Sequence, residues 1–370
     1  MWYNLNMQTN LNLLKAFKPP RCLSLPAAAF DVSDHSIKYM EVKPLKDVGL
    51  VPSVYEERKI KEGIIKEGDI QDLDALVEEL RRFRKKYKSF SFVNIALPEE
   101  LAFVFDIRLK KSDLEEGNIR QYIEFKLPEF IPFNPQNAIF DYDILSDSPT
   151  VLHIAVTVYT REIVEEYASA FEEVGYTVKS AELETVSIAR AIVPNNLSSN
   201  NQTVMVLDIG TNKVGVSILR GLAPVFSTTI THPILKEFED MFRKVHNRKP
   251  KDMQELYDWK FKNGVLLADV SNSQSFKTAI IDEIRKIKDY YTNHKNSGLD
   301  AIQEIYIAGG NAATKGIDAI FSRELELPAR LGNVWQNLLD LEKYIPEIDR
   351  QRSYKLATLT GLVLKEQVYE

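Results

Sequence analysis

Two segments of this chain have the same order of residue types: an apolar run that ends in aspartate, a turn of small and polar residues, and a second apolar run. The first is centred on Asp31 and the second on Asp208, 177 positions further along the chain. One such segment is typical of an ordinary β-hairpin. Its repetition predicts an α/β protein with a duplicated fold, in which two lobes hold a phosphate chain between their turns.

A third turn of small residues follows the apolar segment 302–308, which we expect to be a buried strand. It consists of Gly309, Gly310, Asn311 and Ala312, and a predicted helix over residues 314–325 comes next. Glycines at such a turn allow a flat adenine ring to lie against the backbone, and a helix N-terminus favours an anion. The alternative interpretation is a tight strand-to-helix turn without a ligand.

The composition limits the class of protein. The chain has 370 residues, of which 44% are hydrophobic, and this length predicts two or more domains. The formal net charge of −6 argues against nucleic-acid binding through overall charge. Cys22 is the only cysteine, which excludes an internal disulfide and fits a reducing cytoplasm. No apolar run approaches the roughly 20 residues that span a bilayer, and we expect a cytoplasmic protein without a signal peptide.

We interpret residues 1–24 as an N-terminal extension. Leu11, Leu14 and Phe17 form a short apolar helical stripe that ends before Pro19. In one interpretation this stripe binds a membrane surface or a partner groove. In the other, which we favour, the extension is loosely ordered or packed on its own domain.

The segment between the duplicated hairpins predicts an insertion. A helix begins after Asp69 and ends in a run of basic residues, which is either a patch for anionic surfaces or, as we favour, a solvated helix end. A strand is expected at residues 92–97. The order βαββα follows over residues 98–178, with one helix from position 112 to 125, and indicates a small inserted subdomain. Helical character resumes over residues 181–193.

The turns supply the chemistry of the predicted site. Tight turns of small residues point backbone N–H groups at phosphate oxygens. Asp31 and Asp208, at the strand ends, are placed to orient Mg²⁺, chiefly through its waters. The candidate phosphate-binding residues are Ser33, His35, Ser36 and Lys38 in the first turn and Gly210, Thr211, Asn212 and Lys213 in the second. A bare β-turn is the alternative for either turn alone.

Three further residues complete the candidate site. Glu283 and Lys286 share a helix face and are candidates to bind the ribose and adenine, with a surface ion pair as the alternative. Glu184 enters a helix after a strand, where a carboxylate can orient an attacking water. A helix-cap role is the simpler interpretation of Glu184.

Taken in this order, these features resemble the actin-like ATPase superfamily, and within it the PilM family of type IV pilus assembly. The resemblance extends over residues 25–370. Besides the three turns it rests on the helix at Tyr122 with the turn Ile131-Pro132-Phe133, on the helix that begins near Glu184, and on the helix that contains Asp289-Tyr290-Tyr291.

The resemblance implies a duplicated, ribonuclease H-like fold with two lobes and four subdomains. The implied boundaries are 25–97 and 179–200 for subdomain 1A, 98–178 for 1C, 201–228 and 303–370 for 2A, and 229–302 for 2B. Packing of the last helix on subdomain 1A is compatible with this division.

The resemblance also implies function. It implies ATP and Mg²⁺ in the cleft between the lobes, and a docking site on the 1A/1C side for the short cytoplasmic N-terminal peptide of a PilN-like inner-membrane protein. The protein would then lie at the inner face of the cytoplasmic membrane through its partners. Contacts with other pilus assembly proteins and a homo-oligomer stay open, and no nucleic acid is expected.

The first turn departs from the family pattern. Ser33 stands where the family usually has glycine, and Asp34 and His35 replace small neutral residues. A carboxylate close to phosphates is repulsive, and serine disfavours a positive φ. We therefore expect weak or absent hydrolysis, with ATP acting as a conformational ligand.

Three other functions fit the sequence less well. An FtsA-like filament protein of cell division typically carries an amphipathic C-terminal anchor, and no basic apolar tail follows residues 356–364, so we expect a scaffold instead. A metabolic kinase of the same superfamily needs a catalytic base in a substrate loop, and no aspartate stands out in that role. A dinucleotide-binding oxidoreductase is disfavoured because no Gly-x-Gly-x-x-Gly follows an early strand.

Overall fold

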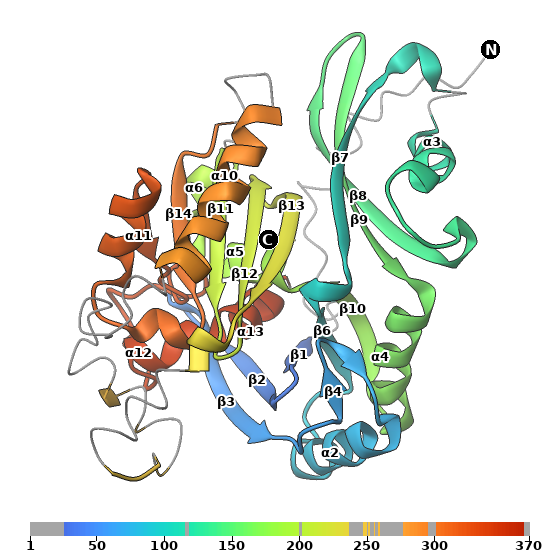
Figure 1. Ribbon diagram of the computed structural model, residues 1–370. Coiled ribbons are helices and arrows are strands. Elements are labelled where there is room, and N and C mark those ends of the chain that lie inside the picture. Colours follow the sequence, from blue (N-terminus) through green and yellow to red (C-terminus); the bar gives the residue numbers. More distant parts are fainter. Residues whose placement is uncertain are drawn as a thin grey trace.

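The computed structural model describes residues 26–114, 118–199, 202–236, 277–294 and 301–365, with a few positions between 247 and 259. Two five-stranded sheets form the framework (Figure 1). The first contains, in spatial order, β10 (Thr177–Leu183), β6 (Phe92–Leu97), β1 (Ala27–Val32), β2 (Ser36–Leu45) and β3 (Gly49–Lys59). The second contains β15 (Ala329–Leu331), β14 (Glu304–Ala308), β11 (Thr203–Ile209), β12 (Lys213–Arg220) and β13 (Ala223–Thr231).

The two sheets have the same topology. In each, the first three strands form an antiparallel meander, and the other two strands run parallel to the first strand. β1 and β11 occupy equivalent central positions, and both are almost entirely buried. Strands buried on both faces consist of continuous apolar runs, as these two do. The predicted duplicated α/β fold is confirmed.

Helices α2 (Leu73–Lys86) and α4 (Arg161–Glu173) cover one face of the first sheet. Phe30 of β1 lies at the centre of this layer, with ring centroids 5.6 Å from Phe83 and 5.0 Å from Phe171. The side chain of Asp72 accepts a hydrogen bond from Ala75 N and caps α2. At the basic end of α2, Arg81 and Arg82 form ion pairs with Glu78 and Glu79 one turn earlier, and Lys86 forms one with Glu56 of β3.

Two helices fill the space between the sheets. α5 (Glu184–Ile192) and α13 (Ala357–Leu364) pack on each other, and their buried side chains contact strands of both sheets. Gly361 makes this close approach possible, because a Cβ at this position would lie 1.7 Å from Ser187 O. Arg190 ties the same layer together through Glu182, at 2.5 Å, and through Gly361 O, at 2.9 Å.

The inserted segment forms a third sheet. Its strands β7 (Phe103–Lys110), β8 (Ala138–Asp147) and β9 (Val151–Thr160) are antiparallel in the order β7-β9-β8, and α3 (Ile119–Lys126) packs beside them. α3 begins later than the sequence predicts, because the Asn118 side chain caps it by accepting from Gln121 N. Residues 111–113 form a short 3₁₀ turn.

The second sheet carries its own helices. The turn Lys277–Ile281 leads into α10 (Asp282–His294), and α11 (Ile317–Leu325) lies beside it; both regions pack on the second sheet. Two shorter helices are α6 (Asn195–Ser199) and α12 (Arg350–Ser353), and a small hairpin pairs β4 (Ile65–Lys66) with β5 (Asp69–Ile70). The expected helix over 181–193 is wrong at its start, because residues 181–183 belong to β10.

The extension 1–24 and most of the segment expected as subdomain 2B lie outside the described residues. Within the part of the chain that the structure describes, no helix is long and apolar enough to cross a membrane.

Candidate functional site

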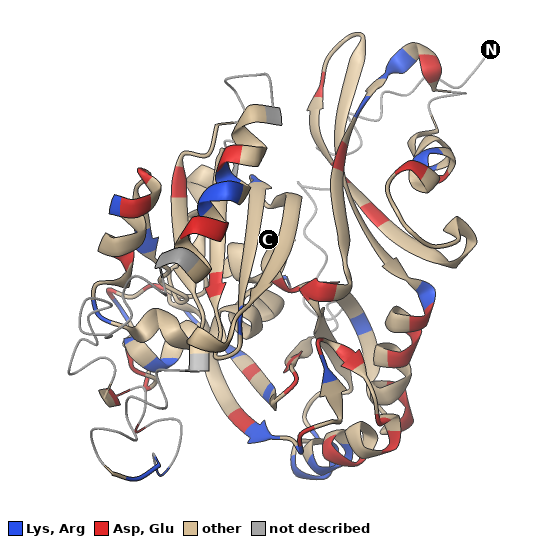
Figure 2. Ribbon diagram, in the orientation of Figure 1, with Lys and Arg blue, Asp and Glu red and all other residues tan. Residues whose placement is uncertain are grey.

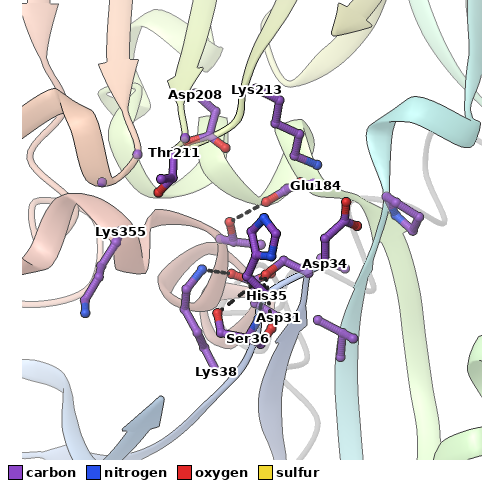
Figure 3. Close-up of a pocket in the computed structure, with 18 of the residues that line it drawn as sticks. Asp31, Asp34, His35, Ser36, Lys38, Glu184, Asp208, Thr211, Lys213 and Lys355 are labelled. Carbon is purple, nitrogen blue, oxygen red and sulfur yellow. Dashed lines mark hydrogen bonds and ion pairs between the residues drawn. The ribbon is translucent and has the colours of Figure 1, made fainter. Parts of the chain in front are cut away.

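A cavity of about 510 Å³ lies between the two sheets, at the ends of β1 and β11 (Figure 3). Both hairpin turns, the start of α5 and the Gly309 turn border it. It brings together most of the residues that the sequence predicts. These are Asp31, Ser33, His35, Ser36, Lys38, Glu184, Asp208, Gly210, Thr211, Asn212, Lys213, Gly309 and Gly310.

The two hairpin turns are built alike. Ser33 N donates to Ser36 O, and Gly210 N donates to Lys213 O, each at 2.9 Å. His35 and Asn212 occupy equivalent places in the two turns, and their side chains contact each other. The turns therefore meet across the pseudo-symmetry that relates the lobes.

Ser33 fits its turn without backbone strain. The described non-glycine residues with a positive φ are Asp47, Glu67, Asn247 and Glu326, so Ser33 does not need the conformation that glycine favours. Its hydroxyl donates to Ser36 O at 3.1 Å. The expected conformational conflict at Ser33 is thus wrong.

Asp34 has a structural role that sequence reasoning missed. Its carboxylate accepts hydrogen bonds from Glu67 N at 2.9 Å and Gly68 N at 3.0 Å. These bonds fasten the first turn to the loop between β4 and β5. The two donors lie 33 and 34 positions from Asp34 in the chain, so no local sequence pattern indicates these hydrogen bonds.

The two aspartates differ in their cross-strand neighbours. The register of the first hairpin puts Lys38 opposite Asp31, and their side chains form an ion pair of 2.6 Å. Burial opposes the charge of Lys38, but Asp31 and Glu57 outweigh it and raise the pKa of Lys38 above its usual value. In the second hairpin Gly215 lies opposite Asp208.

Asp208 is the carboxylate most available to a cation. Among the described residues, its side chain makes no hydrogen bond or ion pair. Burial raises its pKa, while Lys213 and Lys38 work in the opposite direction. A divalent cation beside it would stabilise the charged form, so the donor set fits Mg²⁺ with phosphate oxygens and water.

Glu184 begins α5 and borders the same cavity. Thr358 Oγ1 donates to Glu184 Oε1 at 3.3 Å. Burial raises the pKa of Glu184 to about 8, and Lys213 opposes this shift. Lys213 itself forms an ion pair of 2.5 Å with Glu100. Glu100 is not among the site residues that the sequence predicts.

The third turn fits a close backbone approach. Gly309 has a φ of +93°, and a Cβ there would lie 2.4 Å from Asp208 Oδ1. Only glycine therefore joins β14 to its turn at this place. Asn311 and Ala312 lie behind the cavity surface, and the Asn311 amide donates to Gly210 O at 2.7 Å. Asn311 thus supports the second turn from within the protein.

Glu283 and Lys286 do not border the cavity. They form an exposed ion pair of 2.7 Å on α10, in which 46% of the Glu283 side chain and 71% of the Lys286 side chain are accessible to solvent. The geometry matches the surface ion pair that the sequence left as the alternative.

Sequence reasoning missed a further ion pair at the cavity. Lys355 Nζ lies 2.5 Å from Glu57 Oε2, and Tyr354 and Thr358 border the cavity nearby. Burial works against the charge of Glu57, but Lys355 and Lys38 hold its pKa below the usual value. Lys355 lies 298 positions from Glu57 in the chain, so the sequence contained no local signal for this pair.

Comparison with known proteins places this geometry in a family. The family model described as type IV pilus assembly protein PilM matches residues 29–367. A solved structure of a PilM–PilN type IV pilus biogenesis complex has 16% sequence identity and a TM-score of 0.72, over 93% of this chain and 99% of that one. A search of curated proteins gave no match.

Two other solved structures are more distant. MreB5 of Spiroplasma citri bound to ADP has 13% identity and a TM-score of 0.49, over 93% of this chain and 97% of that one. The ethanolamine utilization protein EutJ from Carboxydothermus hydrogenoformans has 14% identity and a TM-score of 0.44, over 96% and 97%. The family match and the duplicated sheets agree: this chain belongs to the PilM family of type IV pilus assembly proteins and has the actin-like ATPase fold.

Proposed function

We propose that this chain is a scaffold of the inner-membrane complex that assembles a type IV pilus, and that it binds ATP with Mg²⁺ as a conformational ligand. The observation that carries the proposal is that Asp31 and Asp208 border one cavity, together with both hairpin turns. Its volume of about 510 Å³ lies in the range of small-molecule sites.

Different residues of the cavity would bind different parts of the nucleotide. The backbone N–H groups of the two turns, with the side chains of Ser36 and Thr211, would bind phosphate oxygens. Asp208 would hold Mg²⁺ through its waters, with Asp31 supporting it from the opposite hairpin. The magnesium would offset the repulsion between the phosphates and the carboxylates of the cavity. Gly309 and Gly310 would face the nucleoside.

We further propose that the chain docks a short peptide of a PilN-like membrane protein on the side of the first and inserted sheets. The support is the relative of known structure, which is a complex of PilM with PilN. Docking would place this chain at the inner face of the cytoplasmic membrane through its partner. ATP would favour one arrangement of the lobes and so change the affinity for the peptide.

Calorimetry with ATP and Mg²⁺ tests the site. The wild-type protein is expected to bind, and Asp208→Asn to lose most of the affinity, because the amide keeps the shape but not the charge. Glu342→Gln is the matched control, since Glu342 is an exposed acid that does not border the cavity. Absence of ATP binding in the wild type would remove the nucleotide part of the proposal.

The scaffold part needs a second titration. A peptide from the N-terminus of a PilN-like protein is added with and without ATP, and the two dissociation constants are compared. The proposal expects a difference of about 5-fold or more, the lower end of common coupling energies. Equal constants would refute ATP as a conformational ligand, and no binding of the peptide would refute the docking role.

A further inference from the structure

A short acidic segment joins the first sheet to the inserted sheet. The 3₁₀ turn η2 (Glu99–Leu101) follows β6 and precedes β7, so it forms the root of the inserted sheet. Figure 2 shows this segment as an acidic stretch between the second sheet and the inserted sheet. A displacement of η2 would therefore displace the start of β7.

The carboxylates of η2 cross to the second lobe. Glu100 Oε1 lies 2.5 Å from Lys213 Nζ. Glu99, whose exposed fraction is 6%, accepts hydrogen bonds from the hydroxyls of Ser217 in β12 and Ser227 in β13. The root of the inserted sheet is thus covalently part of the first lobe and is held by polar contacts to the second.

Lys213 borders two cavities. It closes the second hairpin turn, and it borders the candidate nucleotide cavity. It also borders a second cavity of about 650 Å³, together with Glu99 and Glu100. The backbone of Lys213 therefore belongs to the turn at the nucleotide cavity, while its ammonium group contacts the root of the inserted sheet.

The contact between Glu100 and Lys213 depends on a single pair of atoms. The second carboxylate oxygen of Glu100 is buried and has no hydrogen-bond partner. A buried carboxylate that loses its only cation keeps its desolvation cost without compensation. An anion that draws the Lys213 ammonium away would leave η2 in an unfavourable position.

We propose that Glu100 couples phosphate occupancy of the second turn to the placement of the inserted sheet. This inference rests on the proposed nucleotide site. A bound phosphate attracts the Lys213 ammonium more strongly than one carboxylate does, weakens the Glu100 contact, and loosens η2 with the start of β7.

The inserted sheet would pivot and stay attached. Leu145 of β8 and Ala155 of β9 pack into the core of the second lobe, and β7 and β9 both contact β13. These apolar contacts do not involve Lys213. Loss of the polar contacts at η2 therefore leaves the apolar part of the interface as the pivot.

Hydrogen exchange of the backbone amides tests the coupling. In the full chain, ATP with Mg²⁺ is expected to speed exchange over residues 99–105 by about tenfold, within the usual range of coupling between sites. Glu100→Gln is expected to show the faster exchange without ATP and little further change when ATP is added.

Glu62→Gln is the matched control. Glu62 is an exposed acid that borders the nucleotide cavity, and it lies outside η2. Its removal changes the charge near the phosphates as Glu100→Gln does. Without ATP, and with ATP at a saturating concentration, it is expected to show the wild-type exchange over residues 99–105, because it leaves the contact between Glu100 and Lys213 in place.

The outcomes separate this inference from the proposed function. If ATP binds and exchange over residues 99–105 does not change, the coupling is wrong and the nucleotide site stands. The same conclusion follows if Glu62→Gln behaves like Glu100→Gln. If calorimetry detects no ATP binding, both fail. Should Glu100→Gln not fold, the response of the wild type to ATP still decides the question.

Discussion

At the scale of single residues, the interface between the lobes concentrates buried acids. Glu184 and Glu99 both have raised pKa values, of about 8 and about 7, because burial disfavours the charged form. Only part of this cost is offset by hydroxyl donors and by Lys213. Buried acids of this kind make the stability of the lobe interface depend on pH.

Glu99 gives a testable consequence. Its pKa rises from 4.5 to about 7 on folding, so the folded state binds more protons than the unfolded state between these values. Stability should therefore fall as the pH rises from 4.5 to 7, with a contribution of up to roughly 3 kcal/mol. Glu99→Gln should lack this pH dependence. Its unfolding free energy, relative to that of the wild type, should therefore be higher at pH 8 than at pH 5. Urea unfolding of both proteins at pH 5 and pH 8 measures this difference in unfolding free energy. A difference that is the same at both pH values would contradict the prediction.

Gly309 gives a second consequence. In Gly309→Ala the new Cβ meets Asp208 Oδ1 and the backbone of Ile209 at a positive φ, and we expect a loss of about 2–4 kcal/mol of unfolding free energy and weaker ATP binding. Gly316→Ala is the control, because Gly316 has a φ of +83° with open space around it. It should cost only about 1 kcal/mol and leave ATP binding unchanged. Equal costs in urea unfolding would show that strain, not the close approach, makes glycine necessary at position 309.

At the scale of elements, helices α5 and α13 join the two lobes. The sequence of α13 is almost wholly buried, with small residues where it crosses α5. A helix that is apolar on all sides is stable only when it is enclosed, and here both sheets enclose it. The relative position of the lobes therefore depends on how closely these helices approach.

Gly361→Ala tests this dependence. The added methyl group would overlap the backbone of Ser187, so the helices must separate, with an expected loss of about 3 kcal/mol or more. Because α13 and α5 lie between the sheets, the substitution should also weaken ATP binding, although Gly361 does not border the cavity. Urea unfolding and calorimetry measure the two effects. Unchanged stability would mean that the helix layer adapts freely.

At the scale of the whole molecule, duplication places two similar hairpins around one cavity. The two turns agree in backbone geometry and differ in charge, since Lys38 faces Asp31 and Gly215 faces Asp208. The lobes are thus alike in fold and differ in the charge that lies beside the strand-end aspartate. A ligand that contacts both turns binds only when the lobes are correctly placed, so it should stabilise that arrangement.

Thermal unfolding measures this stabilisation. ATP with Mg²⁺ at a hundred times its dissociation constant should add about 2.7 kcal/mol to the stability of the wild type and raise its Tm. Asp208→Asn should show little rise at the same concentration. A similar rise in both proteins would indicate that ATP binds elsewhere.

The sequence by itself determined the duplicated sheets and most of the cavity. Central strands, hairpin turns and Asp31 and Asp208 at the strand ends follow from apolar runs and turn residues, which are local and repeat at the same spacing in both halves. The ion pair of Lys38 with Asp31 was not predicted, because Lys38 was expected to bind phosphate and the pair depends on the register of the hairpin.

Only the tertiary structure decided which contacts these side chains make within the protein. Asp34 fastens a distant loop, Asn311 supports the second turn, and Glu283 with Lys286 stays on the surface. The pairs of Glu100 with Lys213 and of Glu57 with Lys355 join residues 113 and 298 positions apart. Such contacts depend on how the lobes pack, and packing between distant segments leaves no periodic pattern in the sequence.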